Sequence, residues 1–574
     1  MYKQAQSLEK ARCKALSEGE FQMFQNKNRR VGKIDPFTTI IPFFAILLCC
    51  AAFLALPDRS AIWLNAVRDF LGESCGVYYL AVGLFVFLLS IYFACSRFGR
   101  IRLGGANETP RYSFFSWGAM MFTAGLAADI LFYSLSEWIS YANEPYLAQL
   151  GTKQDFASTM PLFHWGPIPW AFYAVLAACF GFMLHVRGRN RRKYSEACRP
   201  VLGRWTDRAP GQLIDVLAVF ALLAGTATTF SVATPLLSGA ILKLLGLPAE
   251  NGTRLLSIGI LLFVCAVYTI SVMRGMRGVQ WLAKSCMYLF FALLAFVFLF
   301  GGQARYILET GFSAIGNLAQ NFFLLSTRTD PLRATHFPQN WTIFYWAYWM
   351  VWCVAAPFFM GSISRGRTVR EVILGAYAFG LSATFLSFII LGNYSLGLEM
   401  HGILDVSGIY MEHGSTYETI LAVLGELPMP KLVLALLICS MIAFYATSFD
   451  SITLVAAAYS YRPEKDGEAE KGQKAKERKT KAGKKEAGKS KETEKIEEEE
   501  TYASPLMKLF WSILLILLPL ALLFSESSMQ NLQTVSIIAA FPIALVILLI
   551  IVSFWKDGSM YLEEEAETVA TRKA

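Results

Sequence analysis

The sequence predicts an all-α polytopic membrane protein with twelve transmembrane helices, and two observations carry that prediction. Hydrophobic residues make up 55% of the 574 residues and charged residues only 17%, whereas soluble domains carry about 25% charged residues. The hydrophobic residues are also gathered into runs of about 20, the length that an α-helix needs to cross a bilayer. This composition excludes a disordered protein and argues against a soluble multidomain enzyme.

Twelve apolar runs, separated by charged residues, glycines and prolines, define the predicted spans. The two longest runs exceed what a straight span requires, so we expect tilt, a break or an interfacial turn in them. The expected spans lie at about 36–56, 76–96, 114–141, 165–186, 212–245, 255–273, 285–308, 341–361, 373–396, 431–459, 505–524 and 534–555.

The distribution of lysine and arginine sets the expected orientation. Basic residues concentrate in alternate loops, as they do in cytoplasmic loops of membrane proteins. We therefore expect both termini in the cytoplasm, with an N-terminal segment over 1–35 that is too long and polar for a cleavable signal peptide. A transmembrane domain is expected over 36–555 and a C-terminal tail over 556–574. The loops expected outside hold only Arg59, Arg68, Lys153, Arg254, Arg328 and Arg333.

Two segments between the spans have a distinctive composition. Residues 461–501 are densely charged, of mixed sign and almost free of apolar side chains. That pattern is typical of a solvated, disordered cytoplasmic loop, and a regulatory or lipid-headgroup contact is the alternative. Residues 311–335 are amphipathic and predict an extracellular interfacial helix before the eighth span.

The sequence contains no motif of an enzyme. The 11 cysteines are scattered without a C-x-x-C pair, and the five histidines form no H-E-x-x-H motif. A nucleophile elbow and a P-loop are also absent from the sequence. The formal charge of +9 comes from loops between apolar runs, so nucleic acid is not an expected partner. We expect a transporter without a resident cofactor or metal, embedded in membrane lipid.

Two spans contain residues that interrupt membrane helices at transport sites. The third carries Gly118 and Gly125 together with the acidic Asp129 and Glu137, and the eighth carries Pro357 near its inner end. The two spans are five apart in the chain. This spacing suits two repeats of five helices preceded by two extra helices.

Aromatic residues predict a site for a cation. On a helix with 100° per residue, four of them fall in one stripe of the eighth span and Trp349 lies at its edge. Aromatic faces attract quaternary ammonium groups, each desolvated face contributing about 2 kcal/mol. Plain packing of aromatic side chains is the alternative. The stripe consists of Trp341, Tyr345, Tyr348 and Trp352, and a second cluster in the fourth span consists of Trp165, Trp170 and Tyr173.

Polar residues within the spans offer two routes for ion coupling. Asp129 predicts a proton site or a substrate-cation site, with a structural hydrogen bond as the alternative, because a carboxylate at mid-span is costly to insert. Glu137 lies nearer the outer end, where it could simply reach water. Thr447 and Ser448, near Asp450, offer hard oxygen ligands for Na⁺; hydrogen bonding to the preceding turn is the alternative.

Four stretches resemble the betaine/choline/carnitine transporter family. The most specific is WTIFYWAYWMVWCVAAPFFMGSISRGRTVRE (341–371), a tryptophan-rich span followed by an arginine-rich loop. Anchoring of the inner membrane face explains these arginines, and a part in gating is the alternative. The other stretches are FHWGPIPWAFY (163–173), GTATTFSVATPL (225–236) and TDPLRATHFPQNW (329–341). They look closest to the carnitine/γ-butyrobetaine branch.

The resemblance implies a fold, an assembly and a set of site residues. It implies a LeuT-like inverted repeat formed by spans 3–7 and 8–12, a homotrimer and a plasma-membrane location. One side of the aromatic cage would be Trp165, Trp170 and Tyr173. The other side would be Tyr348, Trp349 and Trp352, with Trp341 in the outer vestibule. The substrate's polar end would meet backbone at the break near Gly125.

Several positions depart from the family's pattern. Tyr348 stands where the family usually has Trp, and Gln280 where sodium-independent exchangers have Arg. Thr447 and Ser448 match the sodium-site pair of sodium-coupled members. Asp129, however, stands where those members have Gly and resembles the proton-coupled choline branch. The residues that bear on the substrate and those that bear on the coupling ion therefore resemble different branches of the family. Further departures are Trp138 for Pro, Ala356 for Met and Ser362 for Arg.

These observations predict a secondary active transporter of a quaternary ammonium compound that works by alternating access. The expected substrates are carnitine, γ-butyrobetaine, glycine betaine or choline, moved by symport or exchange with Na⁺ or H⁺ as the coupling ion. The alternatives are an amine or amino-acid symporter on the same scaffold and an osmoregulated betaine uptake system. The short C-terminal tail favours nutrient uptake over osmoprotection.

Overall fold

The computed structural model describes residues 34–125, 128–189, 191–248, 253–274, 276–461, 504–524 and 529–573. Within these ranges the regular structure is helical, apart from two isolated antiparallel bridges that join Ile34 to Tyr461 and Arg102 to Thr368. Most of the predicted N-terminal segment and of the charged loop at 461–501 lies outside the described residues.

The helices follow one another with short connections. The first half contains α2 (Pro36–Ala55), α3 (Pro57–Asp69), η1 (Phe70–Ser74), α4 (Gly76–Cys95), η2 (Arg97–Arg100), α5 (Phe114–Ala124), α6 (Asp129–Ala142), α7 (Pro145–Ala148), α8 (Lys153–His164), α9 (Pro167–His185), α10 (Tyr194–Ala197), α11 (Arg199–Leu202), η3 (Gly203–Asp207), α12 (Ala209–Leu245) and α13 (Thr253–Met273). The second half contains α14 (Met276–Phe300), α15 (Ala304–Thr327), η5 (Pro338–Thr342), α16 (Ile343–Trp352), α17 (Ala356–Ser362), α18 (Val369–Gly375), η6 (Ala376–Leu381), α19 (Ser382–Ser387), η7 (Phe388–Gly392), α20 (Asn393–Met400), α21 (Val406–His413), α22 (Thr416–Gly425), α23 (Pro430–Tyr459), α26 (Pro505–Phe524) and α27 (Met529–Lys573).

Many of these helices are long and apolar enough to cross a membrane. The described residues contain eight such helices, or up to ten if each of two bent pairs counts as one span. Two shorter apolar stretches, Pro36–Ala52 in α2 and Pro505–Ala521 in α26, accompany them. Each predicted span coincides with at least part of one of these helices. The protein is therefore a multi-pass helical membrane protein.

The structure corrects the boundaries around the seventh predicted span. We expected a span at 285–308 and an interfacial helix at 311–335, but α14 ends at Phe300 and α15 runs from Ala304 to Thr327. The break falls at Gly301 and Gly302, and Gly302 has a φ of +71°, a conformation that favours glycine. Helices α8, α21 and α22 lie in segments between the predicted spans, where no helix was expected.

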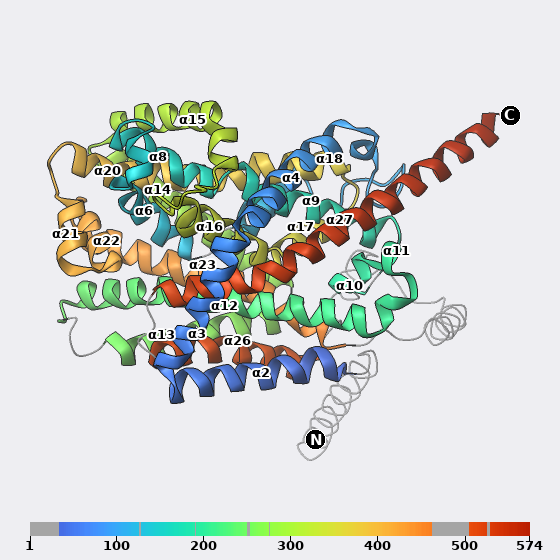
Figure 1. Ribbon diagram of the computed structural model, residues 1–574, viewed down its shortest axis with the longest axis horizontal. Coiled ribbons are helices and arrows are strands. Elements are labelled where there is room, and N and C mark those ends of the chain that lie inside the picture. Colours follow the sequence, from blue (N-terminus) through green and yellow to red (C-terminus); the bar gives the residue numbers. More distant parts are fainter. Residues whose placement is uncertain are drawn as a thin grey trace, which may run out of the picture.

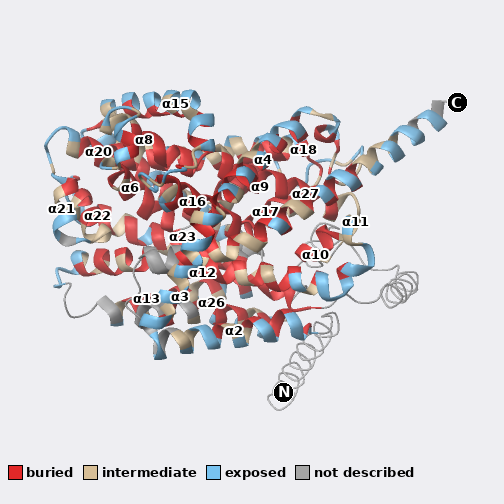
Figure 2. Cartoon of the chain, in the orientation of Figure 1, coloured by how far each residue is buried: buried red, intermediate tan, exposed pale blue. Residues whose placement is uncertain are grey.

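The helices pack around a central group formed by α9, α16 and α17. Close neighbours include α9 with α17, α12 with α27 and α14 with α23. In Figure 1, α15 and α8 lie at the top of the view and α2 and α26 at the bottom. Figure 2 shows buried residues concentrated along the central helices. Every residue of α9 from Ile168 to Met183 is buried, as expected for a helix enclosed by others rather than facing lipid.

The C-terminal tail expected at 556–574 is a helical continuation of α27, which projects from the bundle in Figure 1. Arg187, just after α9, donates from Nε to Asp557 at 2.8 Å, and Arg189 donates to the other oxygen of Asp557 at 2.7 Å. The tail is thus tied to the connection between α9 and α10.

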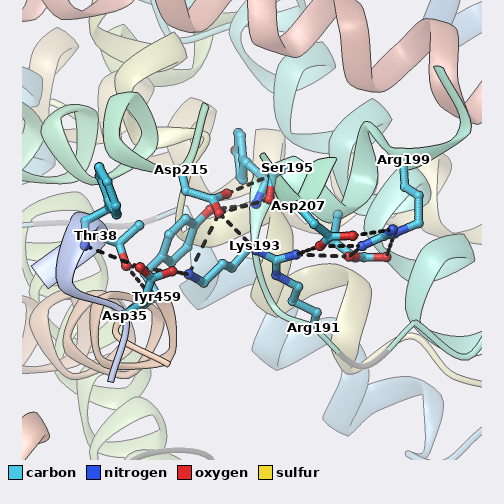
Figure 3. Close-up of polar contacts among 12 residues, drawn as sticks. Asp35, Thr38, Arg191, Lys193, Ser195, Arg199, Asp207, Asp215 and Tyr459 are labelled. Carbon is cyan, nitrogen blue, oxygen red and sulfur yellow. Dashed lines mark hydrogen bonds and ion pairs between the residues drawn. The ribbon is translucent and has the colours of Figure 1, made fainter. Parts of the chain in front are cut away.

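A buried ionic cluster joins chain segments at the end of the bundle that the sequence predicts to be cytoplasmic (Figure 3). Lys193 donates to Asp35 at 2.9 Å and lies 3.8 Å from a carboxylate oxygen of Asp215. Ser195 donates its backbone N–H and its hydroxyl to Asp215. The backbone N–H of Tyr194 bonds to the Tyr459 hydroxyl at 3.0 Å. Burial lowers the pKa of Lys193, and Asp215 and Asp35 oppose that shift.

Candidate functional site

Two bent helix pairs frame the centre of the molecule. The axes of α5 and α6 differ by 59° at a break that begins at Gly125, and the segment Pro338–Trp352 meets α17 at 47°. Both bends fall in the spans that the sequence predicts to be interrupted. Helix ends at such breaks leave backbone N–H and C=O groups that can bind a ligand.

Four aromatic rings meet between the two bends. The ring of Trp349 on α16 lies 5.5 Å from that of Trp165, 5.6 Å from that of Trp170 and 5.0 Å from that of Tyr173. The rings of Trp170 and Tyr173 are 5.4 Å apart. Three of these four contacts are edge-to-face, the arrangement that aromatic pairs prefer. The structure thus brings together four of the residues predicted for the cage.

Glycines allow Trp170 to reach this cluster. A Cβ atom on Gly125 or on Gly380 would overlap the Trp170 ring. Gly125 therefore serves both the break in the third span and the close approach of an aromatic side chain. Trp170 is further fixed by a hydrogen bond of 3.3 Å from its indole N–H to Thr384.

The remaining predicted cage residues lie further from the cluster. Tyr348 connects it to Trp352, with ring centroids 6.3 Å apart. Trp352 is half-buried and lies against α12, where a Cβ on Gly225 would be 3.4 Å from its ring. Trp341 sits at the outer end of the stripe and donates its N–H to Glu144 at 2.7 Å. Its ring lies 5.2 Å from that of Tyr141, and its place in an outer vestibule stays a prediction.

Asp129 is the first residue of α6 and is only 2% exposed. Its side-chain partners are the hydroxyl of Thr229, which donates at 3.2 Å, and the hydroxyl of Tyr348, which also donates to it. The Thr229 and Tyr348 oxygens are themselves 2.8 Å apart. No lysine or arginine of the described chain pairs with Asp129. The site therefore contains a buried carboxylate held by two hydroxyls and, within the described part of the chain, by no lysine or arginine.

Some polar atoms at the cluster have no partner. Among the described residues, the indole N–H groups of Trp349 and Trp352 and the hydroxyl of Tyr133 are buried and form no hydrogen bond. By contrast, Trp165 donates its indole N–H to Glu137 at 2.7 Å. Because buried polar groups are usually satisfied, these atoms are candidate contacts for a bound ligand.

The predicted sodium ligands lie on α23, whereas the four rings come from the end of α8 and from α9 and α16. The Thr447 hydroxyl donates to the carbonyl of Ala443 at 2.7 Å, the local bond expected under the alternative interpretation. Asp450 accepts a hydrogen bond of 3.1 Å from Ser271 on α13. Ser448 is half-buried. A sodium site at these residues stays a prediction.

The arginine-rich loop after α17 pairs with the segment that precedes α5. Arg365 bonds to Glu108 at 2.8 Å, and the guanidinium of Arg367 lies 4.8 Å from the ring centre of Trp117 on α5. The loop thus joins the two bent pairs.

Sequence reasoning missed several partners of the site. Thr229 lies in GTATTFSVATPL, a stretch that carried the resemblance without a role for any single residue. His164, Tyr133 and Thr384 gave no signal of their own, since an isolated residue of these types in an apolar run is ordinary.

Comparisons with known proteins identify the family. Residues 37–476 and 493–562 match the model of the betaine/carnitine/choline family transporter. The chain belongs to this family. The high-affinity choline transport protein of Escherichia coli (strain K12) is 25% identical over 552 residues, which cover 95% of this chain and 75% of that protein.

Other relatives have different named substrates. The glycine betaine transporter OpuD of Bacillus subtilis (strain 168) is 29% identical over 512 residues, covering 88% of this chain and 90% of that one. The carnitine transporter of Acinetobacter baumannii is 25% identical over 531 residues, with 91% and 88% covered. A solved structure of a Na⁺-coupled sialic acid symporter covers 84% of this chain and 81% of its own at 13% identity and a TM-score of 0.34, a value too low to carry an argument. Family membership confirms the expectation of a transporter rather than an enzyme.

Proposed function

We propose that this secondary active transporter of quaternary ammonium compounds carries a choline-like cation, with Asp129 as its counter-charge. The observation that carries the proposal is the burial of Asp129 beside the four rings, where the described residues place no lysine or arginine against it. An ionised carboxylate in such a place requires a proton or a cationic partner. A trimethylammonium group supplies that charge and donates no hydrogen bond, which suits aromatic faces.

The four-ring cluster is the proposed cage for the trimethylammonium. Its rings touch one another, so a substrate enters only when one ring swings aside. Trp165 and Trp170 are tethered through their indole N–H groups to Glu137 and Thr384. Trp349 has no such tether. Trp349 is therefore the ring that we expect to move, after which the substrate cation lies between aromatic faces and within reach of Asp129.

A second candidate function is transport of a zwitterion such as carnitine, γ-butyrobetaine or glycine betaine. The observation that favours it is the pair of unpartnered indole N–H groups of Trp349 and Trp352. A substrate carboxylate could accept both hydrogen bonds. The charge on Asp129 opposes this binding mode, and for that reason we rank it second.

The same carboxylate, Asp129, suggests H⁺ as the coupling ion. Protons compete with a substrate cation for Asp129, so Asp129 alone would exchange one for the other. Na⁺ at Thr447 and Ser448 is the alternative, and it is compatible with the bond from Thr447 to Ala443, because the hydroxyl that donates its proton keeps oxygen lone pairs for a cation. The bends at Gly125 and after Trp352 lie where the helices would move during alternating access.

We further propose the arrangement that the loop charges and the family resemblance imply. It comprises twelve spans, with two N-terminal helices before two inverted five-helix repeats, both termini in the cytoplasm, and a homotrimer in the plasma membrane. The two shorter apolar helices α2 and α26, added to the ten spans counted with the bent pairs, support the number twelve. The position of the bends, five spans apart, supports the repeat.

The test is a binding panel on purified protein. Tryptophan fluorescence would be titrated with choline, glycine betaine, carnitine and γ-butyrobetaine for the wild type and for Asp129→Asn. We expect the variant to lose at least about tenfold in choline affinity, since an opposite charge contributes more than 1.4 kcal/mol in a buried site. Its affinity for the zwitterions should be unchanged or higher.

A matched control is Asp405→Asn. Asp405 caps the N-terminus of α21 far from the site, where Asn is an equally good cap. This variant should bind choline as the wild type does. Equal choline affinity in wild type and Asp129→Asn would refute the role of Asp129, and tighter binding of a zwitterion than of choline by the wild type would favour the second candidate.

A further inference from the structure

A second buried carboxylate lies two turns along α6 from Asp129. Glu137 is 3% exposed and belongs to the same helix face as Asp129, Tyr133 and Tyr141, because these residues follow each other at intervals of four. Its oxygens accept hydrogen bonds from Tyr141 at 2.6 Å and from Trp165 at 2.7 Å. Glu137 therefore contacts a ring of the proposed cage directly.

A histidine completes this cluster. The Tyr141 oxygen is 2.6 Å from Nδ1 of His164, and Nε2 of His164 is 3.0 Å from the Thr342 hydroxyl. His164 is fully buried, and its Nδ1 lies 3.8 Å from Glu137. Towards the predicted extracellular side, the Tyr141 ring contacts Trp341, which bonds to the half-buried Glu144.

The surroundings of Glu137 contain no balancing positive charge. The groups that face it are Tyr133 and Tyr141 on its own helix, His164 and Trp165 from the end of α8, and Tyr345 on α16. No lysine or arginine of the described chain is among them. One residue of the group, Tyr133, has a buried hydroxyl without a partner and lies one turn from both Glu137 and Asp129.

We propose that Glu137 is a second proton-binding site, filled through His164 and Tyr141, and that it makes the transporter a proton symporter. The proposal rests on the proposed function. If Asp129 neutralises the substrate cation, it cannot also hold the proton that travels in the same direction. A carboxylate elsewhere must hold that proton, and Glu137 is the buried carboxylate that touches the cage.

The proton reaches Glu137 by a relay along these hydrogen bonds, in which each intermediate group gains one proton and loses one. A proton binds Nε2 of His164 when the hydrogen bond between Nε2 and the Thr342 hydroxyl opens, and the Nδ1 proton passes to the oxygen of Tyr141. The Tyr141 hydroxyl proton then passes to Glu137. Histidine and tyrosine end neutral, and the carboxylate has gained one proton.

Protonation of Glu137 changes the strength of its hydrogen bond with Trp165, a ring of the proposed cage. An ionised carboxylate holds the indole N–H of Trp165 by a charge-assisted hydrogen bond, which is roughly twice as strong as a neutral one. A proton on Glu137 weakens this bond and frees Trp165 to adjust around the substrate. Proton binding and substrate binding are thereby coupled through one ring.

The test uses Glu137→Gln in the full-length protein. The Gln amide has the shape of a carboxyl group, still accepts from Trp165 and binds no proton near neutral pH. Purified protein would be reconstituted in liposomes that contain a pH-sensitive dye, with the membrane potential clamped, and choline would be added outside. In the wild type, choline entry should acidify the lumen.

In Glu137→Gln we expect the acidification per choline transported to fall at least about tenfold, while choline–choline exchange remains measurable even though the neutral amide holds Trp165 less tightly. Retained exchange shows that the variant is folded and binds substrate. Tyr141→Phe, which removes the bridging hydroxyl, should slow acidification without changing choline affinity. The control Glu399→Gln, which removes a carboxylate paired with Lys153 outside this cluster, should acidify as the wild type does.

The outcomes separate the two proposals. A wild type that does not bind choline overturns the proposed function and this inference with it. Normal choline binding with an alkaline shift of the lumen, the sign of exchange at Asp129 alone, overturns only the inference. Unchanged acidification per choline in Glu137→Gln overturns it as well.

Discussion

Removal of one hydroxyl group should change how strongly protons compete with substrate. In Tyr348→Phe, the carboxylate of Asp129 loses its hydrogen bond from Tyr348 and keeps the bond of 3.2 Å from Thr229 and those from backbone N–H groups at the start of α6. The ring itself stays, so its contacts with Trp165 and Trp352 are retained. The substitution therefore isolates the hydrogen bond from the packing.

The size of the effect follows from the type of bond that is lost. A hydrogen bond to a charged group contributes about 1.5–3 kcal/mol, and one pH unit corresponds to 1.36 kcal/mol. The bond from Tyr348 stabilises the ionised form of Asp129, the form that binds a cation. Without it, protons compete better. The pH at which choline binding is half-maximal should rise by about one to two units.

The assay is a choline titration by tryptophan fluorescence between pH 5 and 9, at constant ionic strength. Tyr377→Phe is the matched control, because its hydroxyl bonds to Ser90 at 2.7 Å rather than to Asp129. This control should keep the wild-type midpoint. A midpoint in Tyr348→Phe that stays within about 0.3 pH units of the wild type, or that falls, would refute the role assigned to the bond.

Three further substitutions test the packing around the site and its supports. Gly125→Ala places a methyl group in the Trp170 ring and should lower choline affinity at least about tenfold, whereas Gly259→Ala, with open space around it, should not. Lys193→Ala removes the lysine cation that is buried beside Asp35 and Asp215 and should destabilise the protein by about 3–5 kcal/mol, seen as a lower melting temperature with choline affinity preserved. Burial raises the pKa of Asp330, but backbone N–H groups of Thr335, His336 and Ala334 outweigh burial and lower it to about 2. Asp330→Asn should therefore lower the melting temperature at neutral pH, and the difference from the wild type should shrink as the pH falls below about 4 towards 2.

The sequence predicts the helices and their interruptions well, because both follow from local chemistry. Runs of apolar residues give the spans, and Gly125 followed by a carboxylate marks the break between α5 and α6. The stripe of Trp341, Tyr345, Tyr348 and Trp352 follows from helical spacing alone. The end of α14 was missed because glycines are common within membrane helices, so Gly301 and Gly302 gave no clear stop signal.

Contacts between distant helices could not be predicted. In the sequence, Asp129 and Tyr348 are two unrelated departures from the family's pattern, 219 residues apart. The structure joins them in one hydrogen bond, so the tyrosine is best understood as the partner that the aspartate requires. The same holds for Glu137: its sequence position suggested access to water, whereas the folded chain buries it against Trp165 and Tyr141.

The most direct test of the cation site compares choline with its neutral isostere, 3,3-dimethyl-1-butanol, in which carbon replaces nitrogen. The two molecules have nearly the same shape and differ in charge. If aromatic faces worth about 2 kcal/mol each and Asp129 recognise the positive charge, calorimetry on the purified protein should find choline at least about 30-fold tighter. Equal affinity for the two compounds would contradict the account, because the site would then recognise shape and apolar surface alone.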